Sequence, residues 1–97
     1  MTLPLSVRTT PHYERLVRGL LKRHPELPGI QERAINILRA DPYNQTKAHN
    51  IKKLVAVAQG ESQWRLSLGR FRFRYDIYGP EVVLHYCGLR REDTYFR

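Results

Sequence analysis

The N-terminal part of the chain combines a short alternating stretch with a longer helical period. Leu3, Leu5 and Val7 alternate with polar or proline positions, which predicts a short strand. Thr10 followed by Pro11 is typical of a helix N-cap with proline at the first helical position. The apolar residues that follow have the spacing of one helix face and are Tyr13, Leu16, Val17, Leu20 and Leu21.

A second helix is expected from about residue 28 to residue 40. His24-Pro25 ends the first helix and Asp41-Pro42 ends the second, because proline does not continue a helix. The predicted buried face of this second helix consists of Leu27, Ile30, Ala34, Ile37 and Leu38. The short link Pro25–Pro28 predicts that the two helices form an antiparallel hairpin.

Residues 43–62 have no clear period. Polar residues such as Asn44 and Asn50 favour a loop, whereas the apolar residues after position 50 are irregularly spaced. We interpret this stretch as an ordered basic loop that enters a sheet and carries His49, Lys52 and Lys53.

The alternating pattern is strongest in the last third of the chain. Apolar and polar residues alternate over residues 64–68 and again over residues 71–77. Gly69-Arg70 and Gly79-Pro80 are turn-forming pairs between these stretches, and a further strand is expected over residues 81–88. The pattern therefore predicts consecutive antiparallel strands and, with the helices, an α+β fold on a small antiparallel sheet.

Short turns fix which residues of these strands face each other. A turn at Gly69-Arg70 pairs Leu68 with Phe71, Ser67 with Arg72, Leu66 with Phe73, and Arg65 with Arg74. A turn at Gly79-Pro80 pairs Ile77 with Val82, Tyr75 with Leu84, Arg74 with His85, Phe73 with Tyr86, and Arg72 with Cys87. One face then holds the apolar residues, Tyr86 included, against the helices. The other face gathers Arg65, Arg72, Arg74 and His85.

This polar face is a candidate anion-binding surface. Like charges directly opposite each other destabilise a sheet, by a few tenths to about 1 kcal/mol per pair. No acidic residue lies between Trp64 and Tyr75 to neutralise the arginines. The whole chain carries a formal net charge of +8, and 13 of its 17 cationic residues are arginine, which binds phosphate in a bidentate manner. The alternative is a solvated polar face with splayed guanidinium groups.

Length and composition narrow the classes of protein to which this chain can belong. With 97 residues, the chain is expected to form one domain, residues 1–97, around one core. No stretch approaches the roughly 18 apolar residues of a membrane span, and the N-terminus does not have the pattern of an export signal. Cys87 is the only cysteine, so a disulfide framework is excluded, and we expect a cytoplasmic protein.

Several motifs, in this order, resemble those of the RelE/ParE superfamily of type II toxins. They are Trp64-Arg65-Leu66, Gly69-Arg70-Phe71-Arg72, the apolar run Val82-Val83-Leu84, Gly88-Leu89-Arg90-Arg91, and Tyr95. The likeness extends over almost the whole chain and is most specific in its final third. It implies a RelE-like fold and a toxin that a cognate antitoxin protein neutralises.

Within this superfamily, the residues are closer to the RelE-like branch, whose members cleave mRNA in the A site of the small ribosomal subunit. The resemblance implies catalytic roles for Arg65, Arg72, Arg90 and Tyr95. Ser67 stands where this branch usually has a second basic residue. Further side chains are expected to bind RNA phosphate, namely Lys52, Lys53, Arg74, Arg91 and His85.

These roles agree with the chemistry of RNA cleavage by its own 2′-hydroxyl. Arginines stabilise the negative charge that grows on phosphorus in the transition state. Arginine is a poor general base, so Tyr95 is the first candidate for that role, with His85, Glu92 and His49 as alternatives. The four histidines show no metal-ligand spacing, and no cofactor is expected.

Two alternatives to an mRNA endoribonuclease follow from the same residues. One is a ParE-like toxin that acts on DNA gyrase without nuclease activity, and the other is a basic module that binds RNA or the ribosome. The expected partners are an antitoxin and ribosome-bound mRNA. No membrane partner is expected, and contact with DNA is expected only through an antitoxin complex.

Overall fold

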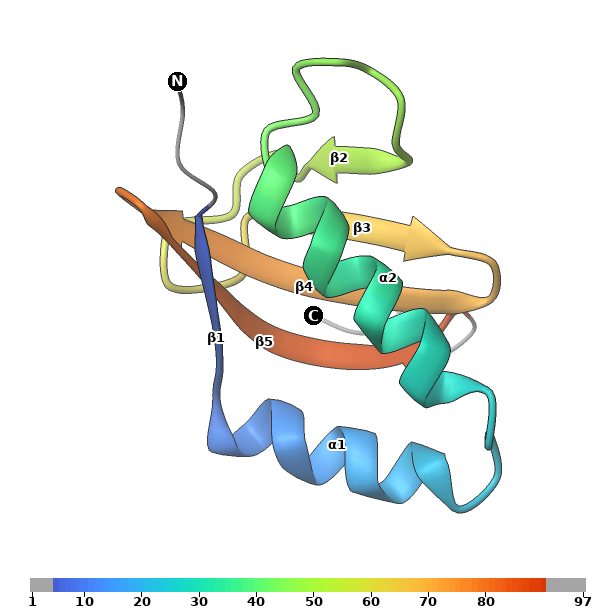
Figure 1. The fold of residues 1–97 in the computed structure, drawn as a ribbon. Coiled ribbons are helices and arrows are strands. Elements are labelled where there is room, and N and C mark those ends of the chain that lie inside the picture. The colour runs from blue at the N-terminus through green and yellow to red at the C-terminus, as the bar shows by residue number, and fades with distance from the viewer. Residues whose placement is uncertain (1–4, 91–97) are drawn as a thin grey trace.

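The computed structural model describes residues 5–90, which form two helices and one five-stranded sheet (Figure 1). In chain order the elements are β1 (Ser6–Thr9), α1 (Pro11–Leu21), α2 (Leu27–Ala40), β2 (Ile51–Lys53), β3 (Trp64–Leu68), β4 (Phe71–Tyr78) and β5 (Glu81–Leu89). The strand order in the sheet is β1-β5-β4-β3-β2. This arrangement confirms the α+β class.

The sheet is mixed, so the prediction of a purely antiparallel sheet is wrong at one edge. β1 runs parallel to β5 and places Val7 opposite Val82, whereas the other neighbouring strands are antiparallel. Hairpin turns determine only how strands adjacent in sequence pair. β1 and β5 are instead joined through most of the chain, including both helices.

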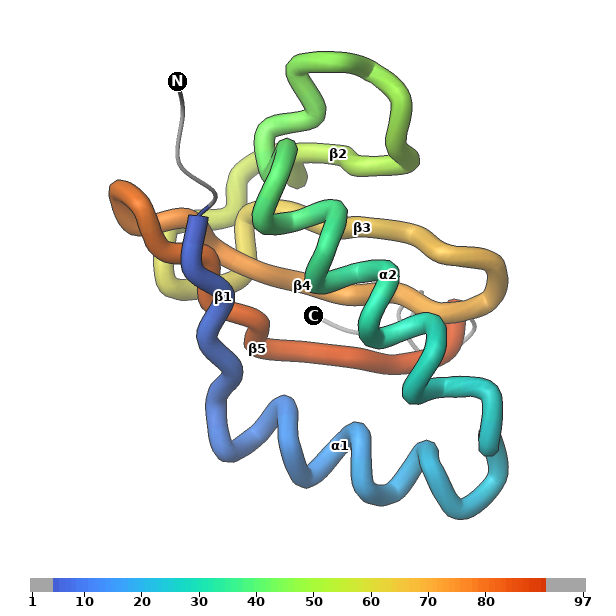
Figure 2. Tube along the Cα trace, in the orientation of Figure 1, coloured from blue at the N-terminus to red at the C-terminus, as the bar shows by residue number. Residues whose placement is uncertain are grey.

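Both helices cover the same face of the sheet and begin close to the predicted positions (Figure 1). The hydroxyl of Thr10 accepts a hydrogen bond of 3.1 Å from the backbone N–H of Tyr13, which confirms the predicted N-cap of α1. α1 packs on β5, whereas α2 contacts β1 and β3. The helices diverge from the turn between them, so they form an open pair rather than a closely packed hairpin (Figure 2).

The core lies between the helices and this face of the sheet. Tyr13 and Val17 of α1, with Leu27, Ala34 and Leu38 of α2, are buried against it. The buried sheet residues of this core are Leu66, Leu68, Phe71, Phe73, Tyr75, Ile77, Val82, Leu84 and Cys87. The helices therefore leave the other face of the sheet to the polar residues of the strands.

The first hairpin has the predicted register. Leu68 lies opposite Phe71, and Arg65 lies opposite Arg74. Gly69 begins the turn with a φ of +58°, a left-handed conformation that glycine adopts without steric cost. The prediction succeeds here because turn chemistry and alternation demand the same pairing.

The second hairpin contains a β-bulge that the sequence pattern does not reveal. Ile77 pairs with Val82 and Tyr75 with Leu84, as predicted, but the register then shifts by one residue. The remaining pairs are Arg74 with Tyr86, Phe73 with Cys87, and Arg72 with Gly88. The predicted pairs of Arg74 with His85, Phe73 with Tyr86, and Arg72 with Cys87 are therefore wrong.

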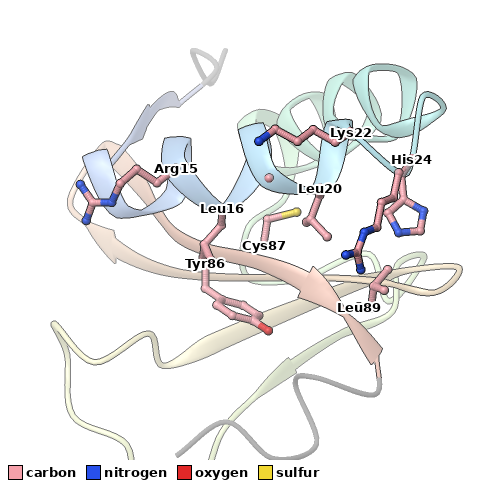
Figure 3. A pocket seen from close by; sticks show the side chains of 10 residues that line it. Arg15, Leu16, Leu20, Lys22, His24, Tyr86, Cys87 and Leu89 are labelled. Carbon is pink, nitrogen blue, oxygen red and sulfur yellow. The ribbon is translucent and has the colours of Figure 1, made fainter.

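The bulge exchanges the faces of two residues, because a shift of one residue turns every side chain beyond it to the other side. Cys87 belongs to the core, and Tyr86 points away from α1 (Figure 3). Tyr86, expected in the core, therefore lies among the arginines.

The segment over residues 43–62, predicted as a basic loop, contains one short strand, β2. This strand pairs with β3 in the antiparallel direction. β2 has only three residues, too few for an alternating pattern to stand out in the sequence. The segment between β2 and β3, residues 54–63, folds back across the end of β4 (Figure 2).

Candidate functional site

The sheet face opposite the helices carries a set of cationic side chains, Lys52, Arg65, Arg72 and Arg74, which we call the basic face. Strand pairing places Lys52 opposite Arg65 and Arg65 opposite Arg74, so three cations form one row across β2, β3 and β4. Arg72 lies on the same face two residues from Arg74, because alternate residues of a strand share a face. The register of Arg65 and Arg74 is as predicted, and β2 adds Lys52, which was predicted in a loop.

Arg65 and Arg72 are partly exposed, whereas Arg74 is only 7% exposed. Nη1 of Arg72 donates hydrogen bonds to the carbonyl oxygens of Gly69 (2.7 Å) and Phe71 (3.0 Å), which hold the guanidinium beside the turn. Nη2 of Arg74 donates to the carbonyl oxygen of Ser62 at 3.0 Å. Arg74 therefore links β4 to the segment 54–63 and presents little surface to a ligand.

Lys52 and Lys53, predicted as a pair, point to opposite faces of the sheet. Lys52 lies on the basic face, opposite Arg65. Lys53 pairs with Trp64, and its Nζ lies 5.6 Å from the centre of the Trp64 ring, on the helix side. Adjacent residues of a strand cannot share a face, so Lys53 is separated from the arginines.

Arg90 directly follows β5 and is exposed. Its backbone N–H donates to the carbonyl oxygen of Arg70 at 2.7 Å, which anchors the end of β5 to the first hairpin turn. Arg91, Glu92 and Tyr95, which the sequence analysis also named, lie outside the described residues.

Asp76 is a site residue that sequence reasoning missed. Its side chain is fully buried on the same side of β4 as Arg72 and Arg74. Oδ2 accepts hydrogen bonds of 3.0 Å from the backbone N–H groups of Gly60 and Ser62, and Oδ1 accepts one of 2.9 Å from Gln63. The carboxylate therefore holds segment 54–63 against the sheet.

His85 lies at the bulge of β5, beside this carboxylate. Its Nε2 is 3.2 Å from Oδ2 of Asp76, and its side chain is 27% exposed. Both His85 and Arg74 line a cleft of about 400 Å³. The other lining residues are His12, Ala56, Val57, Gly60, Glu61, Ser62 and Tyr86. The predicted clustering of His85 with the arginines holds, although its predicted pairing partner was wrong.

The sequence contains one signal for the Asp76 site, but its meaning is clear only once the structure is known. Asp76 continues the alternation of Arg72 and Arg74, so it had to share their face. Its partners are backbone N–H groups at residues 60–63, and no side-chain pattern marks those groups in advance.

Gly88 gives Tyr86 its place on the basic face. A Cβ atom at residue 88 would lie 2.1 Å from Oη and 2.6 Å from Cζ of Tyr86. The phenol ring therefore lies along β5 over residue 88, which is the residue opposite Arg72. A tyrosine hydroxyl is thus brought to the row of Arg72.

A second cavity of about 400 Å³ lies between α1 and β5 (Figure 3). Leu16, Leu20 and Leu89 contribute apolar surface to it, and its cationic residues are Arg15, Lys22 and Arg23. Leu16 and Leu20, predicted as core, are only partly buried and border this cavity.

Two buried tyrosines are unsuited to act as bases. Burial raises the pKa of Tyr13 and of Tyr75 well above the usual value, so both hydroxyls stay protonated. The hydroxyl of Tyr75 donates a 2.7 Å hydrogen bond to the carbonyl oxygen of Pro42, which fixes it in a structural role.

Comparisons with known proteins do not assign a family: no family model matches the chain, and neither curated proteins nor solved structures give a significant match. The likeness to RelE/ParE toxins therefore stays a prediction from the quoted residues. Within residues 5–90, no helix is long and apolar enough to cross a membrane. In the same part of the chain, no three His, Cys, Asp or Glu side chains are grouped as a metal site.

Proposed function

We propose that this protein is the toxin of a type II toxin-antitoxin system and that it cleaves mRNA on the ribosome. The observation that carries the proposal is the row of cations on the face that the helices leave uncovered. Arg65 lies directly opposite Arg74, with Lys52 beside it and Arg72 in the next row. Like charges placed opposite each other repel, and a bound phosphate would offset this repulsion.

In this reaction, Arg65 and Arg72 hold the phosphate that is cleaved and stabilise the charge of the pentacovalent transition state. Arg90 is exposed next to the first hairpin turn and adds a third guanidinium at that end of the sheet. Arg74 is hydrogen-bonded to Ser62 and adds a positive charge next to Arg65. Tyr95 remains the catalytic tyrosine that the family resemblance implies.

The antitoxin is expected to be an acidic chain that also brings apolar residues. A net charge of +8 favours an acidic partner, both in the rate of association and in specificity. The cavity between α1 and β5 offers apolar side chains beside Arg15, Lys22 and Arg23, which fits such a segment.

A purified translation system tests the proposed cleavage. We expect the wild type to cut mRNA in the A site, and Arg72→Ala to cut about 10²–10³-fold more slowly, the usual cost of removing one transition-state stabilising group. Tyr95→Phe should also lose activity. Arg33→Ala is the matched control, because Arg33 is an exposed arginine of α2 on the helix side of the molecule.

Four results would contradict the proposal. Intact mRNA with the wild type would rule out the nuclease. DNA breakage before any block of translation would favour the gyrase toxin instead. Tight RNA binding without cleavage or toxicity would favour a plain RNA-binding module. Equal loss in Arg72→Ala and Arg33→Ala would show that total charge matters, not the basic face.

A further inference from the structure

The contact between Asp76 and His85 is not needed to supply the buried Asp76 carboxylate with hydrogen-bond partners. The buried carboxylate already accepts three backbone hydrogen bonds, from Gly60, Ser62 and Gln63. Three N–H donors already satisfy most of the hydrogen-bonding capacity of a carboxylate. The position of His85 beside it therefore calls for another explanation.

The bulge in β5 creates that position. With a regular register His85 would have been paired with Arg74, but the bulge leaves His85 out of the pairing and gives Arg74 to Tyr86. Bulges interrupt strand pairing and are frequent beside active sites, where they re-aim a side chain. Here the bulge directs an imidazole toward a buried carboxylate at the edge of a cleft.

Of the two ring nitrogens of His85, Nε2 is the one that approaches Asp76. Nε2 is buried and lies 3.2 Å from Oδ2 of Asp76. Among residues 5–90 it forms no hydrogen bond of good geometry, so the contact is best described as an ion pair that strengthens when the ring is protonated. A neutral ring with its proton on Nε2 leaves Nδ1 able to accept a proton.

We propose that His85 is the general base of the RNA cleavage reaction and that Asp76 is its positioning residue. This inference rests on the proposed function. Nδ1 of His85 takes the proton of the 2′-hydroxyl while the bond between O2′ and phosphorus forms. The bond between phosphorus and O5′ then breaks, and O5′ takes a proton from water. The products are a 2′,3′-cyclic phosphate and a 5′-hydroxyl, and His85 returns its proton to solvent.

The charges around His85 suit this cycle. The ionisable groups that face it across the cleft come from three other elements and from its own strand, and they are His12, Glu61, Arg74, Asp76 and Tyr86. Asp76 and Glu61 are acidic, whereas Arg74 is basic. Arg74 also connects the cleft to the basic face, because Arg65 lies directly opposite it.

The rate of ribosome-dependent cleavage as a function of pH tests the inference. We expect the wild-type rate to fall at acidic pH, where an imidazole becomes protonated and cannot act as a base. His85→Ala should be about 10²–10⁴-fold slower, and added imidazole should restore part of the activity. Arg33→Ala, on the helix side of the molecule, should retain both the rate and the profile.

Asp76→Asn tests the positioning role. We expect Asp76→Asn to lower kcat for cleavage with little change in KM, because a residue that only orients the base does not bind substrate. Asp76→Glu, which keeps a carboxylate, should restore part of the rate. A wild-type kcat in Asp76→Asn, or an Asp76→Glu variant as slow as Asp76→Asn, would overturn the positioning role of Asp76.

The possible failures can be told apart. If the wild type cleaves and His85→Ala cleaves equally well, the general base lies elsewhere and the proposed nuclease stands. If His85→Ala is slow but imidazole restores nothing, His85 acts only in folding and the inference is overturned. If the wild type does not cleave at any pH, the proposed function and this inference fail together.

Discussion

At the scale of single residues, the shape of the basic face depends on Gly88. The ring of Tyr86 occupies the space into which any side chain at residue 88 would project. Tyr86 is only 7% exposed, so moving the ring would disturb its present contacts. One missing Cβ atom thus decides where a phenol lies among the arginines.

Gly88→Ala should therefore destabilise the protein through Tyr86. We expect a loss of about 1–3 kcal/mol in the free energy of unfolding, because overpacking a filled site forces side chains out of their preferred rotamers. In the background of Tyr86→Ala, where no ring is present, the same substitution should cost much less. Urea unfolding of the four proteins in this cycle measures the coupling.

Gly19→Ala provides the control for this prediction. Gly19 lies in α1, and no atom comes within 4 Å of a Cβ placed there. Alanine favours helix over glycine by about 1 kcal/mol, so this variant should be as stable as the wild type or more so. An equal cost of Gly88→Ala with and without the Tyr86 ring would show that the clash is not its cause.

At the scale of elements, a buried carboxylate also organises the chain where α2 ends. Asp41 is 8% exposed and accepts hydrogen bonds from the backbone N–H groups of Gln45 and Thr46 and from the Thr46 hydroxyl. Burial alone would raise the pKa of Asp41, but these hydrogen bonds outweigh it and hold that pKa below the usual value. Asp41 thus fixes the path of the chain between α2 and β2.

Asp41→Asn should weaken the fold in a pH-dependent way. A lowered pKa in the folded state means that the ionised carboxylate stabilises the fold above the unfolded pKa of about 3.9. That contribution is lost as the pH falls through the lower, folded pKa. We expect a cost of about 1–2 kcal/mol at pH 7 that shrinks at lower pH, measured by thermal unfolding.

Glu32→Gln is the matched control, because Glu32 is an exposed carboxylate within α2. The thermal stability of Glu32→Gln should equal that of the wild type at pH 7 and at pH 3. A difference between Asp41→Asn and the wild type that stays the same at pH 7 and pH 3 would contradict the assigned role of the ionised carboxylate.

Elements also differ in how far the sequence predicts them. The register of β3 and β4 was predictable because the Gly69-Arg70 turn and the alternating residues agree. The bulge was not, because Tyr86 and Cys87 are each compatible with either face of a strand. β1 pairs with β5 across most of the chain, and no local pattern marks such a contact.

The candidate site, like the elements, was predictable only in part. The row of Arg65 and Arg74 followed from the register, and both lie where the sequence placed them. Asp76 was missed because its partners are backbone groups. The separation of Lys52 from Lys53 was not predictable because β2 was expected to be a loop. Side chains whose position depends on a bulge or on a loop fold are not specified by alternation alone.

At the scale of the whole molecule, charge and architecture act together. Both helices cover one face of the sheet (Figure 1). Strand pairing places three cations in one row on the other face. The formal net charge of +8 would attract RNA to any part of the surface. The row across β2, β3 and β4 places Lys52 and Arg65 at the spacing of neighbouring strands, beside the buried Arg74.

The measurement that tests this account most directly is the salt dependence of binding to a 2′-O-methyl RNA, which cannot be cleaved. We predict that Arg72→Ala binds more weakly and lowers the slope of log K against log salt by on the order of 0.7, the value for one lost contact to a single-strand phosphate. Arg33→Ala, with the same loss of charge on α2, should keep the wild-type slope. Equal slopes for Arg72→Ala and Arg33→Ala would contradict the claim that RNA phosphate is bound on the basic face.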